Sequence, residues 1–394
     1  MQPFSIARLP RIEFGRGAIA RVPDLVAGYG RRALLVTGAR SLQATPQWAS
    51  LCEGLRARGV GLEHCAVAGE PSPQLVDDTV ARLAAARIDV VVAIGGGSAL
   101  DAGKAIAGLL RVGRSVLDYL EGVGPERPYE GPAVPFIACP TTAGTGSEAT
   151  KNAVLSTHGA GAYKKSFRDD RLVPAWAVVD PALLAPCPPA LIAANGMDAL
   201  TQLLESYVSL RANPLTDALA ESGLAAVRDG LLDWYRGGAQ AHAAQDRMAY
   251  AALLSGITLA QTGLGSVHGL AAPLGAFFPV PHGVACGTLV AAATALNLRA
   301  LRARQAGSPA LAKYGRAGEI LAGRPFADAA DAADGLADLL GRWTDAMGLS
   351  RLSAFGMGEG DLATVVAHCR GSSMKTNPLV LADDEIAALL RERL

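Results

Sequence analysis

The sequence predicts an α/β domain with a parallel sheet, followed by an all-helical domain. At 394 residues the chain is too long for one ordinary hydrophobic core, so about two domains are expected. In the first half, short β-branched segments alternate with longer amphipathic ones, which is typical of a parallel sheet covered by helices. After Pro181 the β-branched segments disappear, and long Ala- and Leu-rich segments of helical period follow.

The expected strands and helices of the first half follow one another at regular spacing. The run ALLVT at 33–37 and the run at 90–94 are continuous and apolar, as in strands that are buried on both faces. Further strands are expected at 61–67 and 134–139, and helices at 45–58, at 73–86 and directly after Ser98.

The second half has the apolar period of helices throughout. A proline cluster at 186, 188 and 189 marks the change, so we place the boundary near residue 185 and expect domains at 1–185 and 186–394. The expected helices are 189–209, 214–231, 246–260, 284–302, 309–322, 328–347 and 383–392.

Charge and cysteine content limit the class of protein. Lys and Arg together number 36, as do Asp and Glu, which removes the electrostatic case for binding nucleic acid or an anionic membrane. The six cysteines are scattered without a CxxC pair, which fits reduced thiols in the cytosol. No signal-peptide core and no run of about eighteen apolar residues is found. We therefore expect a cytoplasmic protein that acts on a small molecule.

A glycine-rich loop lies between the strand at 90–94 and the helix that follows it. Glycines at 95, 96 and 97 let backbone approach a phosphate, and the free N–H groups of a helix N-terminus complement its charge. The segment Gly95–Ser98 matches neither GxGxxG nor the Walker motif. On its own it fits a phosphate cradle and a tight βα turn equally well.

A second loop repeats this pattern one strand later, in the run PTTAGTGSEAT at 140–150. Its hydroxyls could hold phosphate or ribose, or they could satisfy their own backbone in a turn. Ligands of open α/β sheets bind at the carboxyl ends of the strands. Two such loops after successive strands therefore favour a cofactor that carries a pyrophosphate.

The second half contains candidate metal ligands. Asn195, Asp198, Gln202 and Glu205 fall on one face of the expected helix, and a four-residue step is how a helix directs two ligands at one ion. A solvated polar face is the alternative. Two of the chain's six histidines, His268 and His282, lie in one Gly- and Pro-punctuated stretch, although a lone histidine is more often a core or surface residue than a ligand.

An ordered series of segments gives a family resemblance. Together they span most of the chain, and the chain resembles the iron-containing, group III alcohol dehydrogenases. The segments are IEFGRGA (12–18), VVVAIGGGSALDAGKAIA (90–107), PTTAGTGSEAT (140–150), AVVDP (177–181), NGMDALTQLLESYVS (195–209), NPLTDALA (213–220) and HGLAAPLGAFFPVPHG (268–283).

The resemblance implies a dehydroquinate synthase-like fold, with a dinucleotide-binding domain followed by a helical metal-binding domain. It implies an NAD(P)-dependent interconversion of alcohol and carbonyl, assisted by Fe²⁺ or Zn²⁺ as a Lewis acid. The family holds its metal with an Asp and three His, which fall here at Asp198, Gln202, His268 and His282. Asp198, His268 and His282 match and are the implied catalytic set.

Gln202 departs from the family pattern, because it offers a neutral amide oxygen where the family usually has an imidazole. The change should weaken affinity for late transition metals. An Asp, His, His set can still form a three-ligand catalytic site, as in the zinc-dependent glycerol dehydrogenases of the same superfamily. A second departure is Ala272, where many members carry a further histidine near the reacting alcohol, so no general base can be named.

The cofactor end shows a third departure. Members that prefer NAD often read Val-Thr-Asp after the first strand, whereas this chain reads Val-Thr-Gly at 36–38. Loss of the carboxylate removes its repulsion of a 2′-phosphate, and Arg40 or Ser41 could meet that phosphate, so NAD and NADP both stay open. The implied cofactor neighbours are Gly38, Ser41, Gly95, Gly96, Gly97, Ser98, Asp101, Thr141, Thr142, Thr145, Ser147 and Lys165.

Three alternatives to a metal-assisted dehydrogenase are weighed. A metal-independent reductase of the maleylacetate reductase kind is kept open by Gln202 and Ala272, and opposed by the other three metal residues. A lyase like dehydroquinate synthase would need a basic cluster for a phosphorylated sugar acid, and none lies near the metal residues. A non-enzymatic binding module ranks last. We expect a small, mostly apolar alcohol or aldehyde as substrate, and a homo-oligomer, a dimer.

Overall fold

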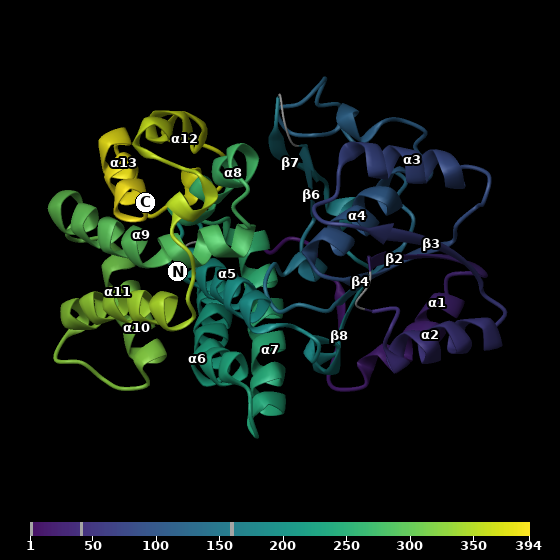
Figure 1. The fold of residues 1–394 in the computed structure, drawn as a ribbon, viewed down its shortest axis with the longest axis horizontal. Helices are drawn as coiled ribbons and strands as arrows, with labels where there is room; N and C mark the ends of the chain where they lie inside the picture. Colours follow the sequence, from purple (N-terminus) through teal and green to yellow (C-terminus); the bar gives the residue numbers. More distant parts are fainter. Residues whose placement is uncertain (1–2, 40–41, 158–160) are drawn as a thin grey trace. The chain divides into compact units, whose positions relative to one another are not determined.

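The computed structural model describes residues 3–39, 42–157 and 161–394 of the chain. It divides into two compact units, Ala7–Pro186 and Cys187–Leu394, and the described residues before Ala7 group with the second unit. Figure 1 shows strands in the first unit and helices throughout the second.

The first unit is built on a parallel sheet, as predicted, and the sheet has six strands. Its interior strands are almost wholly apolar because they are covered on both faces. In sheet order the strands are β1 (Arg11–Phe14), β8 (Trp176–Val179), β5 (Phe136–Pro140), β4 (Val90–Gly95), β2 (Arg32–Gly38) and β3 (Gly61–Val67).

Alternate residues of the strands supply two separate cores. Leu34 and Val36 of β2 enter one cluster, and Ala33 and Leu35 enter the other, because successive side chains of a strand point to opposite faces. Residues of α3 (Pro73–Leu83) and α4 (Gly97–Leu109) complete the first cluster, and residues of α1 (Val22–Ala27) and α2 (Pro46–Ala57) complete the second. Figure 1 shows these helix pairs on opposite faces of the sheet.

A hairpin of β6 (Asn152–Thr157) and β7 (Tyr163–Arg168) was not among the expected elements. Its second strand, YKKSFR, carries polar residues at most positions and buries only Phe167, so it lacks the apolar run of a sheet strand. β1 and β8 were also not expected. Each is only four residues long, which is short for a recognisable period.

The second unit contains helices from end to end. α5 (Pro189–Val208) is its centre, because nearly all of its residues are buried and it packs against α6, α7 and α9. The remaining helices are α6 (Pro214–Arg236), α7 (Ala241–Thr262), α8 (Ser266–Phe277), α9 (His282–Arg304), α10 (Pro309–Ala322), α11 (Ala329–Ala346), α12 (Leu362–His368) and α13 (Asp383–Glu392). Of these, α8 and α12 were not expected.

One helix in the described part of the chain, α9, is long and apolar enough to cross a membrane by composition. Of its apolar window, 78% is buried inside the protein, as in the core helix of a folded domain.

Candidate metal centre and cofactor loops

The polar face of α5 points into the protein. Asp198 is 0% exposed, Gln202 is 3% and Glu205 is 7%, whereas Asn195 is partly exposed. The alternative of a solvated polar face is therefore wrong for these three residues. Carboxylates are rarely buried unless they are paired or coordinate an ion.

His268 joins this buried face from the first turn of α8. Its Nε2 lies 3.2 Å from Oδ1 of Asp198, and its Nδ1 lies 2.7 Å from Oε2 of Glu205. The backbone N–H of Val267 donates to the other oxygen of Glu205 at 2.7 Å. Glu205 thus accepts from a backbone N–H group in the first turn of α8. It also fixes the orientation of the imidazole, as the carboxylate partner of a ligating histidine does.

His282 reaches the same carboxylate from the first residue of α9. Its Nε2 lies 3.7 Å from Oδ1 of Asp198, and the two imidazole rings are 5.4 Å apart. A Cβ at Gly283 would lie 2.4 Å from the carbonyl oxygen of Ala194. Only glycine therefore lets the start of α9 approach α5 so closely.

A further residue, Cys286, lies with the three matching ligands and was not predicted. One donor atom from each of Asp198, His268, His282 and Cys286 lies within 4.8 Å of all the others. Cys286 follows His282 by four residues on α9, which is the same helical step as between Asp198 and Gln202. That step in the sequence was the signal available for finding it.

One oxygen of the cluster is left without a hydrogen-bond partner within the described part of the chain. Oδ2 of Asp198 is buried and has no hydrogen-bond partner among the residues that the structure describes. Burial would raise the pKa of Asp198, but His282 and His268 hold that pKa below its ordinary value. A buried, ionised carboxylate with an unsatisfied oxygen beside two imidazoles has the donor chemistry of a divalent-metal site.

Gln202 contacts Asp198 and Ser255. Its amide nitrogen donates to Oδ1 of Asp198 at 3.1 Å, and its amide oxygen accepts from the Ser255 hydroxyl at 2.7 Å. The amide oxygen, which the sequence suggested as a ligand atom, therefore faces Ser255. Ala272, at the position of the missing family histidine, is exposed on α8.

The two candidate phosphate loops lie side by side in the first unit. β4 and β5 are adjacent parallel strands, so both loops leave the same edge of the sheet. A Cβ on Gly97 would lie 2.7 Å from Cγ2 of Thr145, and one on Gly96 would lie 3.4 Å from Thr142. Gly95 similarly approaches the backbone nitrogen of Gly38.

The start of α4 opens directly onto these loops. Gly97 and Ser98 are its first residues, and the first N–H groups of a helix have no partner within it. Ser98, Thr141, Thr142 and Thr145 are each partly exposed. This edge therefore combines closely packed backbone, a helix N-terminus and partly exposed hydroxyls, which suits a phosphate.

Two other predicted cofactor neighbours, Asp101 and Ser147, bind one another. The Ser147 hydroxyl donates to Oδ1 of Asp101 at 2.6 Å. Beneath them Lys104, 0% exposed, donates to the carbonyl oxygens of Ser147 and Asn152 at 2.8 and 2.7 Å. Burial lowers the pKa of Lys104 to about 8. Asp101, Lys104 and Ser147 thus hold the second loop against α4.

Two predicted cofactor residues, Lys165 and Ser41, remain to be placed. Lys165 is exposed on β7, whereas its neighbour Lys164 points to the other face of the strand and forms an ion pair with Glu70. Ser41, together with Arg40, lies outside the described residues.

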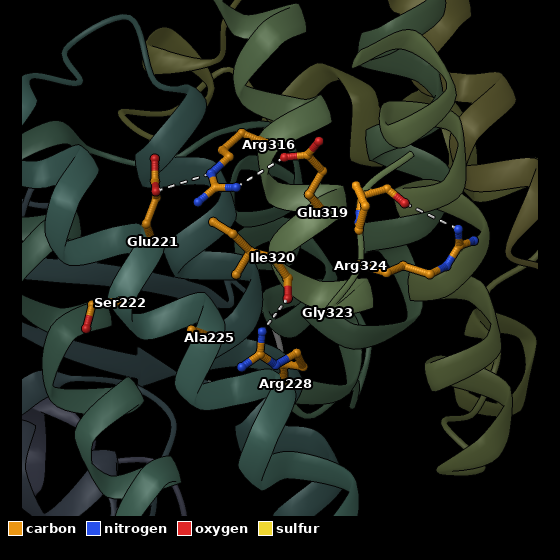
Figure 2. Close-up of a pocket in the computed structure, with 10 residues that line it drawn as sticks. Glu221, Ser222, Ala225, Arg228, Arg316, Glu319, Ile320, Gly323 and Arg324 are labelled. Atoms are coloured by element: carbon orange, nitrogen blue, oxygen red, sulfur yellow. Dashed lines mark hydrogen bonds and ion pairs between the residues drawn. The ribbon is translucent and has the colours of Figure 1, made fainter. Parts of the chain in front are cut away.

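A separate hollow of about 530 Å³ lies on the helical unit (Figure 2). Two of its three arginines are ion-paired, since Arg316 contacts Glu221 and Glu319, and Arg228 contacts Asp229. The third, Arg324, lies over the ring of Phe326. No predicted ligand lines it, so it is not part of the candidate metal centre.

Comparison with known proteins agrees with this geometry. The family model for iron-containing alcohol dehydrogenase matches residues 10–181, and the model for the C-terminal part of the Fe-containing alcohol dehydrogenase family matches residues 192–394. Alcohol dehydrogenase 4 of Saccharomyces cerevisiae (strain YJM789) is 35% identical over 74% of this chain and 75% of its own length. The NAD-dependent methanol dehydrogenase of Bacillus methanolicus is 31% identical over 98% of both chains.

Solved structures share the whole fold. A 1,3-propanediol oxidoreductase covers 100% of both chains with a TM-score of 0.89 and 30% identity. An alcohol dehydrogenase from Oenococcus oeni covers 100% of both chains with a TM-score of 0.87 and 26% identity. The chain therefore belongs to the iron-containing alcohol dehydrogenase family and is an NAD(P)-dependent oxidoreductase that interconverts alcohols with aldehydes or ketones.

Proposed function

We propose that this enzyme holds a divalent metal with Asp198, His268 and His282 and uses it in the oxidation of a small alcohol or the reduction of the matching aldehyde or ketone. The observation that supports this most directly is the convergence of two imidazoles on a buried carboxylate with an unsatisfied oxygen. A bound Fe²⁺ or Zn²⁺ would supply Lewis-acid polarisation of the substrate oxygen.

The protein's own groups prepare this centre. Asp198 brings the negative charge that a dication needs, and burial keeps water from competing for it. Glu205 accepts from Nδ1 of His268, so Nε2, on the side of Asp198, would give up its proton and bind the metal. Because the pKa of Asp198 is held low, the carboxylate stays ionised across the neutral range.

We assign the cofactor to the two loops that follow β4 and β5 in the first unit. Gly95–Ser98 and the hydroxyls of Thr141, Thr142 and Thr145 would hold the pyrophosphate of NAD or NADP, supported by the shared sheet edge from which both loops leave. β2 ends in Thr37 and Gly38, without the acidic residue that selects against a 2′-phosphate. We infer that NADPH is accepted as well as NADH.

Relatives named for methanol, 1,3-propanediol and lactaldehyde support a short-chain substrate, although another relative is named for long-chain alcohols. We infer a similarly small substrate. A cytoplasmic location and a homodimer stay predictions, the first supported by six cysteines of which none forms a disulfide in the described part of the chain.

A metal-independent reductase is the second candidate, favoured by Gln202 and Ala272 at two positions where the family has histidine. The buried Oδ2 of Asp198 weighs against it, because that oxygen has no hydrogen-bond partner among the described residues and a bound cation would satisfy it.

A screen tests the proposal. Protein purified without added metal is analysed for its elements and assayed for oxidation of NADH and NADPH over short aldehydes, ketones and keto acids. We expect about one metal per chain, turnover with short aldehydes and measurable turnover with NADPH. A chain free of metal that reduces only unsaturated keto acids would support the second candidate instead, and strict NADH preference would contradict the inference on NADPH.

A further inference from the structure

The fourth ligand position of the metal centre is one point at which this chain departs from its family. Cys286 is buried on α9, one turn after His282. Its Sγ lies 3.6 Å from Nε2 of His268 and 3.8 Å from Nε2 of His282. A Cβ on the next residue, Gly287, would lie 2.9 Å from Met197 of α5. This close packing of α9 against α5 places the Cys286 thiol beside the two imidazoles.

The spacing of these atoms is that of ligands around one small ion. Zinc binds nitrogen and oxygen at roughly 2.0–2.2 Å and thiolate sulfur at roughly 2.3 Å in a tetrahedron. Such bond lengths separate neighbouring N and O ligands by about 3.4 Å, and S and N ligands by about 3.6 Å. The separations in this chain are 3.2 and 3.7 Å from Asp198 to the imidazoles and 3.6 and 3.8 Å from Cys286 to the imidazoles.

Gln202 directs its amide nitrogen, and not its amide oxygen, toward Asp198. With Asp198 ionised, the amide group 3.1 Å from Oδ1 must be the NH₂, because an amide oxygen there would oppose a carboxylate oxygen. The NH₂ group has no lone pair to offer an ion. Ser255 holds the amide oxygen on the opposite side.

We propose that Cys286, as a thiolate, is the fourth protein ligand of the metal, and that Gln202 stands behind Asp198 and positions it. The inference rests on the metal centre of the proposed function. It replaces the family's third imidazole with a sulfur from a different helix, so that the set becomes Asp, His, His and Cys.

Binding through the sulfur of Cys286 would affect both the release of a proton and the choice of metal. Without a metal, burial raises the pKa of the Cys286 thiol to about 12, so the free residue is protonated. Forming the sulfur–metal bond breaks the S–H bond and releases that proton to solvent. Thiolate is a softer donor than imidazole and favours Zn²⁺ and Co²⁺ over Fe²⁺ relative to the usual family set.

Cobalt spectroscopy tests the assignment on the full-length protein. Co²⁺-loaded wild type should show a near-ultraviolet thiolate-to-cobalt charge-transfer band. Cys286→Ser should lose the charge-transfer band and bind cobalt about tenfold more weakly or worse. Cys369→Ser is the matched control, because Cys369 is equally buried, lies outside the metal cluster and donates its thiol to the backbone carbonyl of Val366.

The outcomes separate the two proposals. Stoichiometric cobalt without a charge-transfer band, or a band that persists in Cys286→Ser, overturns the role of Cys286 and leaves the metal centre standing. Wild type that binds no cobalt overturns the metal centre itself. Should Cys286→Ser not fold, X-ray absorption of the zinc-loaded wild type gives the same answer, since one sulfur at about 2.3 Å is expected. A shell of nitrogen and oxygen only contradicts the inference.

Discussion

His268 is the side chain on which the proposed metal centre depends most. It lies between Asp198 and Glu205, and its imidazole is fixed by both. We predict that His268→Ala lowers bound metal to well below one per chain and turnover by at least about a hundredfold. Metal content by elemental analysis and NADH oxidation measure the two effects separately.

His242→Ala serves as the control, because His242 is exposed near the start of α7 and outside the cluster. This variant should keep both its metal and its activity. If His268→Ala retained stoichiometric metal, the ligand assignment would be wrong.

Sequence reasoning reached much of this centre but not all of it. Asp198 and Gln202 could be placed on one helix face by period alone, and the ordered family segments added His268 and His282. The direction of the Gln202 amide could not be predicted, because it depends on Ser255, 53 residues away in the chain. Cys286 was missed because a lone cysteine in an apolar helix also has the pattern of a core residue.

The loop that follows β5 contains a buried acid with a consequence for stability. Glu148 is 2% exposed, and burial raises its pKa from 4.5 to about 7. The folded state therefore binds more protons than the unfolded state between these values. Stability from this group is fully present below pH 4.5 and is lost as pH rises through 7, by roughly 3 kcal/mol.

We predict that Glu148→Gln removes this dependence. Wild type and variant should unfold at similar temperatures near pH 5, and the variant should be the more stable by several degrees at pH 7.5. Thermal unfolding at a series of pH values measures the difference between the two proteins. Glu319→Gln, a change at a partly exposed glutamate of α10, should leave the pH dependence intact. Parallel curves for wild type and Glu148→Gln would show that Glu148 titrates normally.

Among the helices and strands, those with a long and uniform period were predictable. α10 and α13 were expected at 309–322 and 383–392, where the structure has them. α8 was not, because Pro273 and two glycines interrupt its sequence, and proline normally ends a helix. The β6–β7 hairpin was missed for a different reason: its partly solvated, lysine-bearing strand has no continuous apolar face.

Over the whole molecule, the sequence predicted the class of fold because the two halves have different periods. Burial on both faces gives the apolar strands of the parallel sheet, and the helical unit surrounds α5. The order of the strands could not be predicted, since it depends on crossovers that leave no local mark on the sequence. β1, first in the chain, pairs with β8, the last strand of the sheet.

The two halves also separate the chemistry. The residues proposed for the dinucleotide lie within Ala7–Pro186, and the proposed metal ligands lie within Cys187–Leu394. Removal of the metal should therefore abolish turnover while NADH still binds, because no proposed cofactor residue is a metal ligand.

Exhaustive chelation followed by metal restoration tests the central claim most directly. The chelated enzyme should contain no metal, still bind NADH by fluorescence titration, and have lost at least about 99% of its aldehyde reduction, which added Zn²⁺ or Fe²⁺ restores. Full activity in protein shown by elemental analysis to be free of metal would contradict the claim that this oxidoreductase works through a metal centre at Asp198, His268 and His282.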